Sequence, residues 1–545
     1  MELISVILSM LVAVVASGIL VRSIPVALPT PLVQIGLGAV IAAVPSLPDV
    51  HLDPDVFFLL FLPPLLFLDG WRIPKEGLLH DRVTILQLAF GLVIFTVIGM
   101  GGLIHWMIPA VPYPVAFALA AIISPTDPVA VSAISARTPM PKRVMHVLEG
   151  ESLLNDASGL VCFRLALAAV LTGSFSLPAA SLTFVQLVIE GIAVGTGLTY
   201  GVMRAKNLIS ERLGEEAGSQ ILISLLIPFG AYQLAEHLGA SGILAAVSAG
   251  ITMSYSELSG RALASTRVQR TAVWDTVQFA LKGVMFVLLG EQLPGILSGA
   301  VRVVQDTRHL NPWWLAVYAL AINFGLASLR FIWVWVSVHL TRYLARRRGE
   351  ETSGRPTVRL IAAMSAAGVR GAITLAGVLT VPLTLPTGEP FPARDLIIFL
   401  AAAVIIVSLL AASIGLPRLL IGVEMPADST AEEERYRARS VAAHSAIRAI
   451  ERASHEMARG EGEAELYAEA AARVMDSYRR RFEGEMTAED AAHVRRSNEI
   501  ERALRLIGIN AEREALFALA RSEVLSQESS RKLIRELDLM EERLQ

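Results

Sequence analysis

The segment GESLLNDASG, residues 150–159, places polar side chains inside an apolar run that extends from Met145 to Leu171. Its polar residues are Glu151, Ser152, Asn155 and Asp156. Residues four positions apart share one side of a helix, so these residues cluster toward one face. Carboxylates at membrane depth are costly and occur mainly where ions or protons move. A purely structural cluster that joins helices is the alternative, but such clusters rarely need two carboxylates so close together.

Two other apolar runs combine polar residues with residues that break helices. The sequence SPTDP at 124–128 holds Thr126 and Asp127 between two prolines, and AAGVRG at 366–371 holds Arg370 between two glycines. Within a membrane, a broken helix is tolerated only where protein or a water-filled cavity satisfies the freed backbone groups. The two breaks therefore predict an internal polar site.

The composition indicates a polytopic helical membrane protein. Of 545 residues, 54% are hydrophobic and only 18% are charged, and the mean hydropathy is +0.55 although the C-terminal part is polar. The net charge of −3 and the lack of a basic stripe argue against a nucleic-acid partner. The single cysteine, Cys162, excludes an intramolecular disulfide.

Runs long enough to cross a bilayer predict about thirteen transmembrane helices. The runs are 4–21, 27–46, 56–70, 83–107, 113–135, 145–171, 183–203, 219–237, 240–255, 273–297, 314–341, 357–384 and 395–421. We expect the third to be interrupted at Pro63-Pro64 and the fifth and twelfth at the two breaks. Breaks in the fifth and twelfth spans occupy matching positions in two halves, a pattern typical of inverted-repeat transporters.

Loop charges predict the orientation of the chain. Basic residues concentrate in alternate connections, such as 72–82, 137–143 and 342–359, while the intervening connections hold few. By the positive-inside rule the N-terminus lies outside and the C-terminus lies in the cytoplasm. We expect residues 1–423 to form the membrane domain and the Ala-, Glu- and Arg-rich residues 424–545 to form a cytosolic helical tail.

Three stretches of the chain resemble the signature sequences of bacterial sodium/proton exchangers, the electroneutral branch of the cation:proton antiporter superfamily. They are PTDPVAVSAI (125–134), GESLLNDASGLV (150–161) and GVRGAITLA (368–376). The resemblance covers essentially the whole membrane portion, about 1–421. It implies a secondary antiporter in the bacterial plasma membrane that contributes to pH and sodium homeostasis, and a homodimer.

The resemblance also implies roles for individual residues. Asp156 matches the aspartate that binds the ion and carries the proton, and Asn155 matches the asparagine that replaces a second aspartate of electrogenic relatives. Ser152 and the backbone carbonyl of Thr126 match further contributors to the shell of the sodium ion. Glu151 matches a glutamate that pairs with an arginine of the eleventh span; the residues of this pair here are Glu151 and Arg330.

Two positions depart from the family pattern. The acid that follows PPLLF is displaced by Leu68 to Asp69, and Lys282 lies in the tenth span where an uncharged polar residue is expected. We assign no ligand role to Asp69, and the residues do not identify a partner for Lys282.

The chemistry of the residues agrees with this interpretation. A hard monovalent cation prefers oxygen ligands, which Asp156, Ser152 and Thr126 supply together with water. Burial favours the neutral carboxyl, so one aspartate can hold either a proton or a cation. Asp127 near half-helix N-termini and Arg370 near half-helix C-termini would compensate the exposed dipole ends.

Exchange of one proton per monovalent cation is the leading hypothesis, with no enzymatic activity and no cofactor, because only Asp156 is expected to titrate. An intramembrane aspartyl protease that uses Asp127 and Asp156 as a dyad is the main alternative, but NDASG lacks the GxGD-type setting of that class. An ion channel is a third possibility, and no repeated filter sequence supports it.

Overall fold

The computed structural model describes residues 2–23, 28–44, 54–72, 85–127, 131, 140, 142–173, 177–214, 216–257, 264–306, 311–347, 358–421, 429–457, 464–483, 488–521, 533–534 and 536–541. It divides into two compact units, Met1–Glu424 and Met425–Gln545. The first unit contains every residue that the sequence analysis selected as a site residue.

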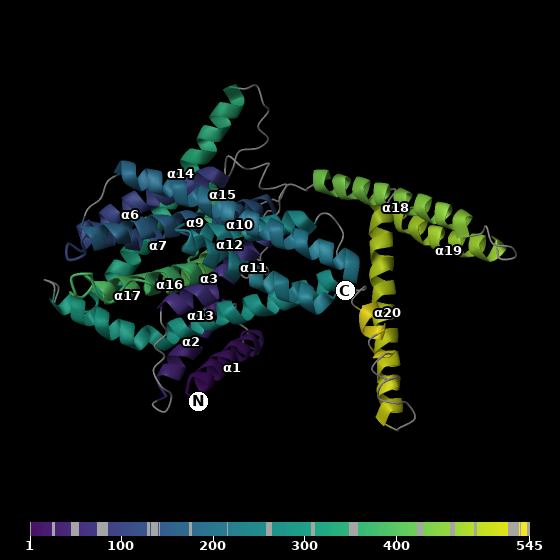
Figure 1. Ribbon diagram of the computed structural model, residues 1–545, viewed down its shortest axis with the longest axis horizontal. Helices are drawn as coiled ribbons and strands as arrows, with labels where there is room; N and C mark the ends of the chain where they lie inside the picture. Colours follow the sequence, from purple (N-terminus) through teal and green to yellow (C-terminus); the bar gives the residue numbers. More distant parts are fainter. Residues whose placement is uncertain are drawn as a thin grey trace. The chain divides into compact units, whose positions relative to one another are not determined.

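The first unit is helical throughout its described ranges, apart from one isolated bridge between Thr384 and Pro390. Its helices are α1 (Glu2–Ser23), α2 (Thr30–Ala42), α3 (Pro54–Arg72), the π-helix η1 (Gln87–Leu92), α6 (Val93–Met107), α7 (Tyr113–Ile122), α9 (Lys142–Thr172), α10 (Leu177–Leu213), α11 (Ala217–His237), α12 (Gly242–Glu257), α13 (Ala264–Asp306), α14 (Trp314–Arg347), α15 (Val358–Ala366), α16 (Ala372–Leu379) and α17 (Arg394–Leu420). Figure 1 shows these helices with their labels.

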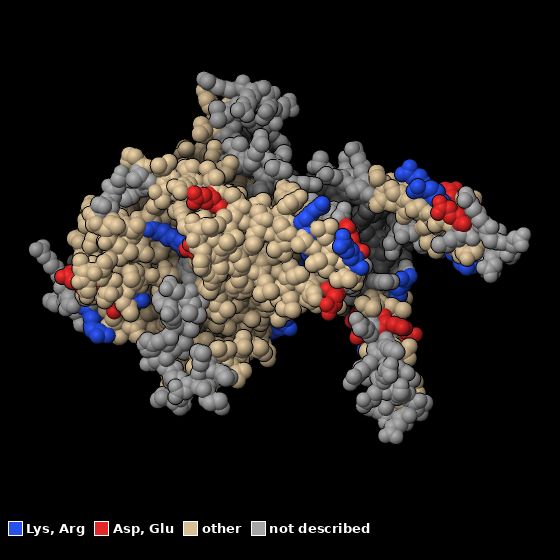
Figure 2. All heavy atoms as spheres, viewed as in Figure 1, with Lys and Arg blue, Asp and Glu red and all other residues tan. Residues whose placement is uncertain are grey.

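The length and composition of these helices fit a polytopic membrane protein. Among the described residues, eight helices are long and apolar enough to cross a membrane, and α2 and α7 are shorter apolar helices. Each of the thirteen predicted runs overlaps at least one described helix. Uncharged residues cover most of the described surface of this unit on the face shown in Figure 2, as lipid contact requires. The helical membrane architecture is confirmed, and the exact number of thirteen crossings stays a prediction.

The structure places backbone interruptions at two of the three expected positions. Helix α7 ends at Ile122 and is followed by non-helical residues as far as Asp127, and a non-helical segment separates α15 from α16. The third interruption was wrong, because α3 continues through Pro63 and Pro64. The fixed φ angle of proline suits a helix, but each proline loses one hydrogen bond and its ring crowds the carbonyl four residues earlier. The neighbouring Leu62, Leu65 and Leu66 are buried, so packing holds α3 together.

The helices of the first unit pack in two groups. In one, which we call the α3/α13 group, α13 packs against α1 and α2, and α12 packs against α3, α10 and α11. In the other, the α9/α14 group, α7 packs against α6 and α9, and α14 packs against α6, α15 and α17. The main contacts between the groups join α13 to α17, and join α16 to α3 and α13. The two broken spans therefore belong to one group and face the other.

A glycine-rich stretch of α10 shows how closely the helices of the α3/α13 group pack. A Cβ atom at Gly191 or Gly195 would meet backbone atoms of the α11–α12 region, such as the carbonyl oxygen of Ala245 at Gly195. A Cβ atom at Gly197 or Gly201 would meet nothing within 4 Å. Glycine is therefore required on the side of α10 that faces α12, where the two backbones approach each other.

The second unit consists of helices α18 (Ser429–Met457), α19 (Ala464–Glu483) and α20 (Ala488–Arg521) in its described ranges, with a short helical piece near its end. Helix α18 packs against α19, and Arg513 of α20 pairs with Asp538 at 3.0 Å and with Glu541. The expected turn at Gly460-Glu461-Gly462 lies outside the described residues.

Candidate functional site

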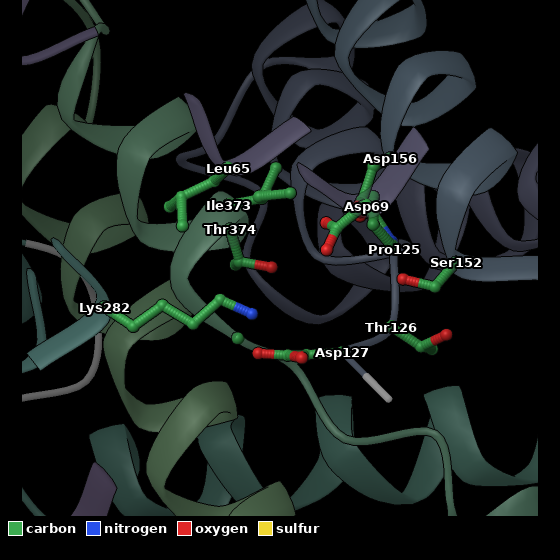
Figure 3. A pocket seen from close by; sticks show the side chains of 11 residues that line it. Leu65, Asp69, Pro125, Thr126, Asp127, Ser152, Asp156, Lys282, Ile373 and Thr374 are labelled. Carbon is green, nitrogen blue, oxygen red and sulfur yellow. The ribbon is translucent and has the colours of Figure 1, made fainter. Parts of the chain in front are cut away.

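A pocket lies between the two helix groups and is bounded by both backbone breaks. Its empty volume is about 410 Å³. The α9/α14 group contributes the segment after α7, one face of α9 and the start of α16, and the α3/α13 group contributes α3 and α13. The lining residues are Leu65, Asp69, Pro125, Thr126, Asp127, Ser152, Asp156, Lys282, Gly371, Ile373 and Thr374. Figure 3 shows their side chains converging on one space.

Asp156 is a buried carboxylate of this pocket that has no hydrogen bond or ion pair within the described part of the chain. Its residue surface is 5% exposed, and its carboxylate makes no hydrogen bond or ion pair with any described residue. Ser152, one helical turn earlier on α9, is buried and lines the same pocket, and its hydroxyl points into the space in Figure 3. Asp156 and Ser152 thus share a helix face, as their spacing predicts.

Thr126 and Asn155 are bound to Glu151 behind the pocket. The Thr126 hydroxyl donates to Glu151 Oε1 at 3.3 Å, and Asn155 Nδ2 donates to Thr126 Oγ1 at 3.1 Å and to Glu151 Oε1 at 3.4 Å. Thr126 lines the pocket, whereas Asn155 is not among the lining residues. The Thr126 hydroxyl thus donates one hydrogen bond and accepts another, and Asn155 contacts Thr126 and Glu151 rather than the pocket.

Glu151 and Arg330 form a bidentate ion pair. Arg330 Nη1 lies 2.5 Å from Glu151 Oε1, and Arg330 Nη2 lies 2.8 Å from Glu151 Oε2. The side chains are 0% and 3% exposed, and Arg330 Nε also donates to the carbonyl of Met364 at 3.2 Å. This geometry joins α9, α14 and α15 within the α9/α14 group. Each charge of this buried pair is neutralised by the other.

The two backbone breaks cross at Asp127 and Arg370. The backbone N–H of Asp127 donates to the carbonyl of Val369 at 2.7 Å. Arg370 Nε donates to the carbonyl of Ile123 at 2.9 Å, at the C-terminal end of α7, and Nη1 donates to the carbonyl of Gly368 just after α15. The guanidinium thus satisfies carbonyls at two half-helix C-termini, where a positive charge is favourable.

The two glycines around Arg370 provide space for charged side chains. A Cβ atom at Gly371, the N-cap residue of α16, would collide with the Asp127 side chain. A Cβ atom at Gly368 would lie 2.7 Å from Cδ of Arg330. Asp127 therefore lies at the N-terminus of α16, where a carboxylate is stabilised by the helix dipole.

Three polar or charged lining residues have no role in the sequence analysis. Asp69 of α3 and Lys282 of α13 reach the pocket from the α3/α13 group, and Thr374 comes from the first turn of α16. A charged residue inside an apolar run was the available signal for Lys282 and Asp69. Thr374 carries no such signal, because a threonine in an apolar run is ordinary.

Comparison with known proteins identifies similar chains. The profile of the sodium/hydrogen exchanger transmembrane family matches residues 7–422. An uncharacterized Na⁺/H⁺ exchanger of Escherichia coli strain K12, YjcE, is 39% identical, and the match covers 99% of this chain and 98% of that protein. A sodium, potassium, lithium and rubidium/H⁺ antiporter of Bacillus pumilus is also 39% identical, with 98% of this chain and 77% of that protein covered.

A solved structure has the same fold. The sodium proton antiporter MjNhaP1 from Methanocaldococcus jannaschii at pH 8 matches with a TM-score of 0.55 at 17% sequence identity. The match covers 78% of this chain and 99% of that one. The likeness concerns the arrangement of the helices.

Proposed function

The chain belongs to the sodium/hydrogen exchanger family and exchanges cations for protons across a membrane, and from this premise we propose that Asp156 is the group that carries both ions in turn. The observation that supports this proposal is the state of its carboxylate. It lies deep in the pocket and has no hydrogen bond or ion pair with a described residue. Burial penalises an ionised carboxylate that has no counter-ion, so it will take up either a proton or a cation.

The remaining ligands of the cation are oxygens of the same helix group. Ser152 Oγ faces the pocket, the backbone carbonyl of Thr126 belongs to its lining segment, and water fills the remaining positions of the shell. Sodium accepts such oxygen ligands, and Asp127 adds negative charge nearby. The site carries the ion across when the pocket opens to one side at a time by relative movement of the two helix groups.

We further propose that one proton is exchanged for each monovalent cation. Asn155 is an amide and does not titrate. Glu151 is committed to the bidentate contact with Arg330, and Asp127 lies at the N-terminus of α16. In this proposal Asp156 alone changes its protonation in the cycle, so transport moves no net charge.

Sodium is the proposed cation, with potassium, lithium and rubidium as the competitors to test. The Bacillus pumilus relative and a Bacillus subtilis relative, which is 42% identical over 77% of this chain, are both named sodium, potassium, lithium and rubidium/H⁺ antiporters. A pocket of oxygen ligands completed by water discriminates weakly among monovalent cations of different size.

The wider setting follows from the family and from the charges of the loops. We place transport in residues 1–423, treat 424–545 as a cytosolic helical tail, and place the N-terminus outside. The protein would act as a homodimer in the bacterial plasma membrane, where sodium/proton exchange maintains internal pH and sodium.

Transport by proteoliposomes that contain the purified full chain tests the role of Asp156. With an inward sodium gradient, Asp156→Asn should lose sodium-driven proton flux while its thermal unfolding in detergent stays cooperative. Glu190→Gln is the matched control, because Glu190 is a partly exposed acid of α10 that lies outside the pocket and accepts a hydrogen bond from Gln186, and it should keep the flux. Sodium-driven proton flux in Asp156→Asn that equals that of the control would refute the assignment.

The charge moved per cycle requires a separate measurement. The initial rate of exchange should be the same with and without thiocyanate, a permeant anion that collapses any membrane potential. Thiocyanate is preferable to a potassium ionophore, because the named relatives also handle potassium. A rate that rises when thiocyanate is added would show that a second group titrates.

A further inference from the structure

Two of the hydroxyl groups that line the pocket lack a hydrogen-bond partner among the described residues. The lining residues with a hydroxyl are Thr126, Ser152 and Thr374. The Thr126 hydroxyl is hydrogen-bonded to Glu151 and to Asn155, whereas neither Ser152 nor Thr374 makes a hydrogen bond with a described residue. Thr374 is 1% exposed, so its hydroxyl is a buried polar group that requires a partner.

The break between α15 and α16 explains why the Thr374 hydroxyl lacks the usual partner of a helical threonine. Such a threonine donates its hydroxyl to the carbonyl three or four residues earlier. Thr252 and Thr271 do so in this chain, each with the carbonyl four residues earlier. For Thr374 these positions are Arg370, which is not helical, and Gly371, whose backbone is extended. Because Thr374 lies in the first turn of α16, the break removes the internal acceptor.

The Thr374 hydroxyl lies opposite the oxygens of α9. Figure 3 shows the hydroxyls of Thr374 and Ser152 pointing toward each other across the pocket, which Asp156 also lines. Helix α9 and the start of α16 both belong to the α9/α14 group. A cation bound between them would therefore keep these ligands when the two helix groups move. A hydroxyl oxygen is a neutral, hard ligand of the kind that a hard cation accepts.

We propose that the Thr374 hydroxyl is a ligand of the transported monovalent cation, supplied by α16 from the side opposite Ser152. This inference rests on the proposed role of Asp156, and Thr374 takes one of the positions that water would otherwise fill in the shell of the ion. Burial of a hydroxyl without a partner costs free energy, and contact of its oxygen with the cation removes that cost. The second break thus contributes an ion ligand in addition to the helix ends that Arg370 satisfies.

The test compares Thr374→Val with Thr374→Ser in proteoliposomes that contain the full chain. Valine has nearly the shape of threonine, but a methyl group replaces the oxygen and leaves no space for a water molecule there. For Thr374→Val we expect the KM for sodium, measured at alkaline pH where protons compete least, to rise about tenfold. Thr374→Ser keeps the oxygen and should restore the KM of the wild type. Thr380→Val is the matched control, because Thr380 follows α16 outside the pocket and donates to the carbonyl of Gly377.

An unchanged KM for Thr374→Val would overturn the inference, and so would an equal rise of the KM in Thr374→Ser, which would indicate packing rather than the oxygen. If Thr374→Val is not produced in folded form, Thr374→Ala lacks the same oxygen, and sodium should stabilise it less against thermal unfolding in detergent than it stabilises the wild type; equal stabilisation would contradict the proposal. Asp156→Asn, measured alongside, separates the two proposals. If it loses sodium-driven flux while Thr374→Val keeps its KM, the role of Thr374 alone is wrong, whereas flux retained in Asp156→Asn refutes the proposed carrier and with it the shell that Thr374 completes.

Discussion

Removal of either member of the Glu151–Arg330 pair should destabilise the first unit more than any single change at its surface. Both side chains are buried, at 0% and 3% exposure, and are joined by two contacts of 2.5 and 2.8 Å. Glu151→Gln leaves the guanidinium in a low-dielectric environment without a counter-charge, and Arg330→Met leaves the carboxylate in the same position. Loss of one partner of a buried pair costs about 3–5 kcal/mol.

The hydrogen bonds around the pair indicate where each variant should lie within the range of about 3–5 kcal/mol. In Glu151→Gln the amide oxygen can still accept from Asn155, Thr126 and one Arg330 nitrogen, so we expect about 3 kcal/mol. Arg330→Met also removes the hydrogen bond to the Met364 carbonyl and leaves the buried Glu151 carboxyl without its counter-charge, so we expect about 5 kcal/mol. In the double variant neither charge remains, and its cost should be smaller than the sum of the two single costs by about 1–3 kcal/mol.

Reversible unfolding in mixed micelles would measure these differences. Asp275→Asn is the control, because its partner Arg72 forms an ion pair on the same unit whose side chains are 37% and 59% exposed. An exposed pair of this kind is worth about 0–1 kcal/mol. The reasoning fails if the buried variants lose no more stability than the control, or if the two single costs simply add in the double variant.

Two further predictions concern how the helices contact each other. Gly195→Ala should destabilise the protein by about 1–3 kcal/mol, because the added Cβ would meet the α12 backbone. Gly197→Ala should stabilise the protein by about 0.5–1 kcal/mol, because nothing lies within 4 Å of the added Cβ and alanine favours the helix. Thermal unfolding of both variants measures the two effects, and a Gly195→Ala variant more stable than Gly197→Ala would contradict the prediction. Arg164 of α9 and Glu236 of α11 form an ion pair of 3.0 Å between the two helix groups, with side chains 35% and 33% exposed. Arg164→Gln should therefore alter the exchange rate by at most about fivefold and leave the KM for sodium unchanged, and a large change in KM would place Arg164 in the cation site instead.

The sequence predicted the local features of the fold because hydropathy and helix breakers act over short distances. The apolar runs contain the helices, and the breaks before Asp127 and around Arg370 lie where prolines and glycines remove helical hydrogen bonds or relax the backbone. The same reasoning failed at Pro63 and Pro64. There the buried leucines around the prolines hold α3 in a continuous helix, and no local rule measures such tertiary packing.

The site required information that local patterns do not contain. Glu151 and Arg330 are 179 residues apart in sequence, and only the family resemblance suggested that they meet. The sequence marked Asp69 and Lys282 as unusual but could not place them. Their approach to Asp156 depends on how α3 and α13 pack against the other helix group, which is decided by long-range contacts such as those of α16.

The charged residues of the site form two kinds of pair. In one kind both residues belong to the same helix group, and in the other the two residues belong to different groups. Glu151 and Arg330 belong to one helix group, so any movement of that group carries a closed, neutral pair whose contacts stay unchanged. Lys282 and Asp156 belong to different groups, so movement between the groups changes their separation and hence their electrostatic interaction. A cation held at Asp156, as proposed, interacts with Lys282 across the same gap. The free energy of cation binding is thereby coupled to the relative position of the groups, and such coupling is the physical requirement for a carrier that opens to one side at a time.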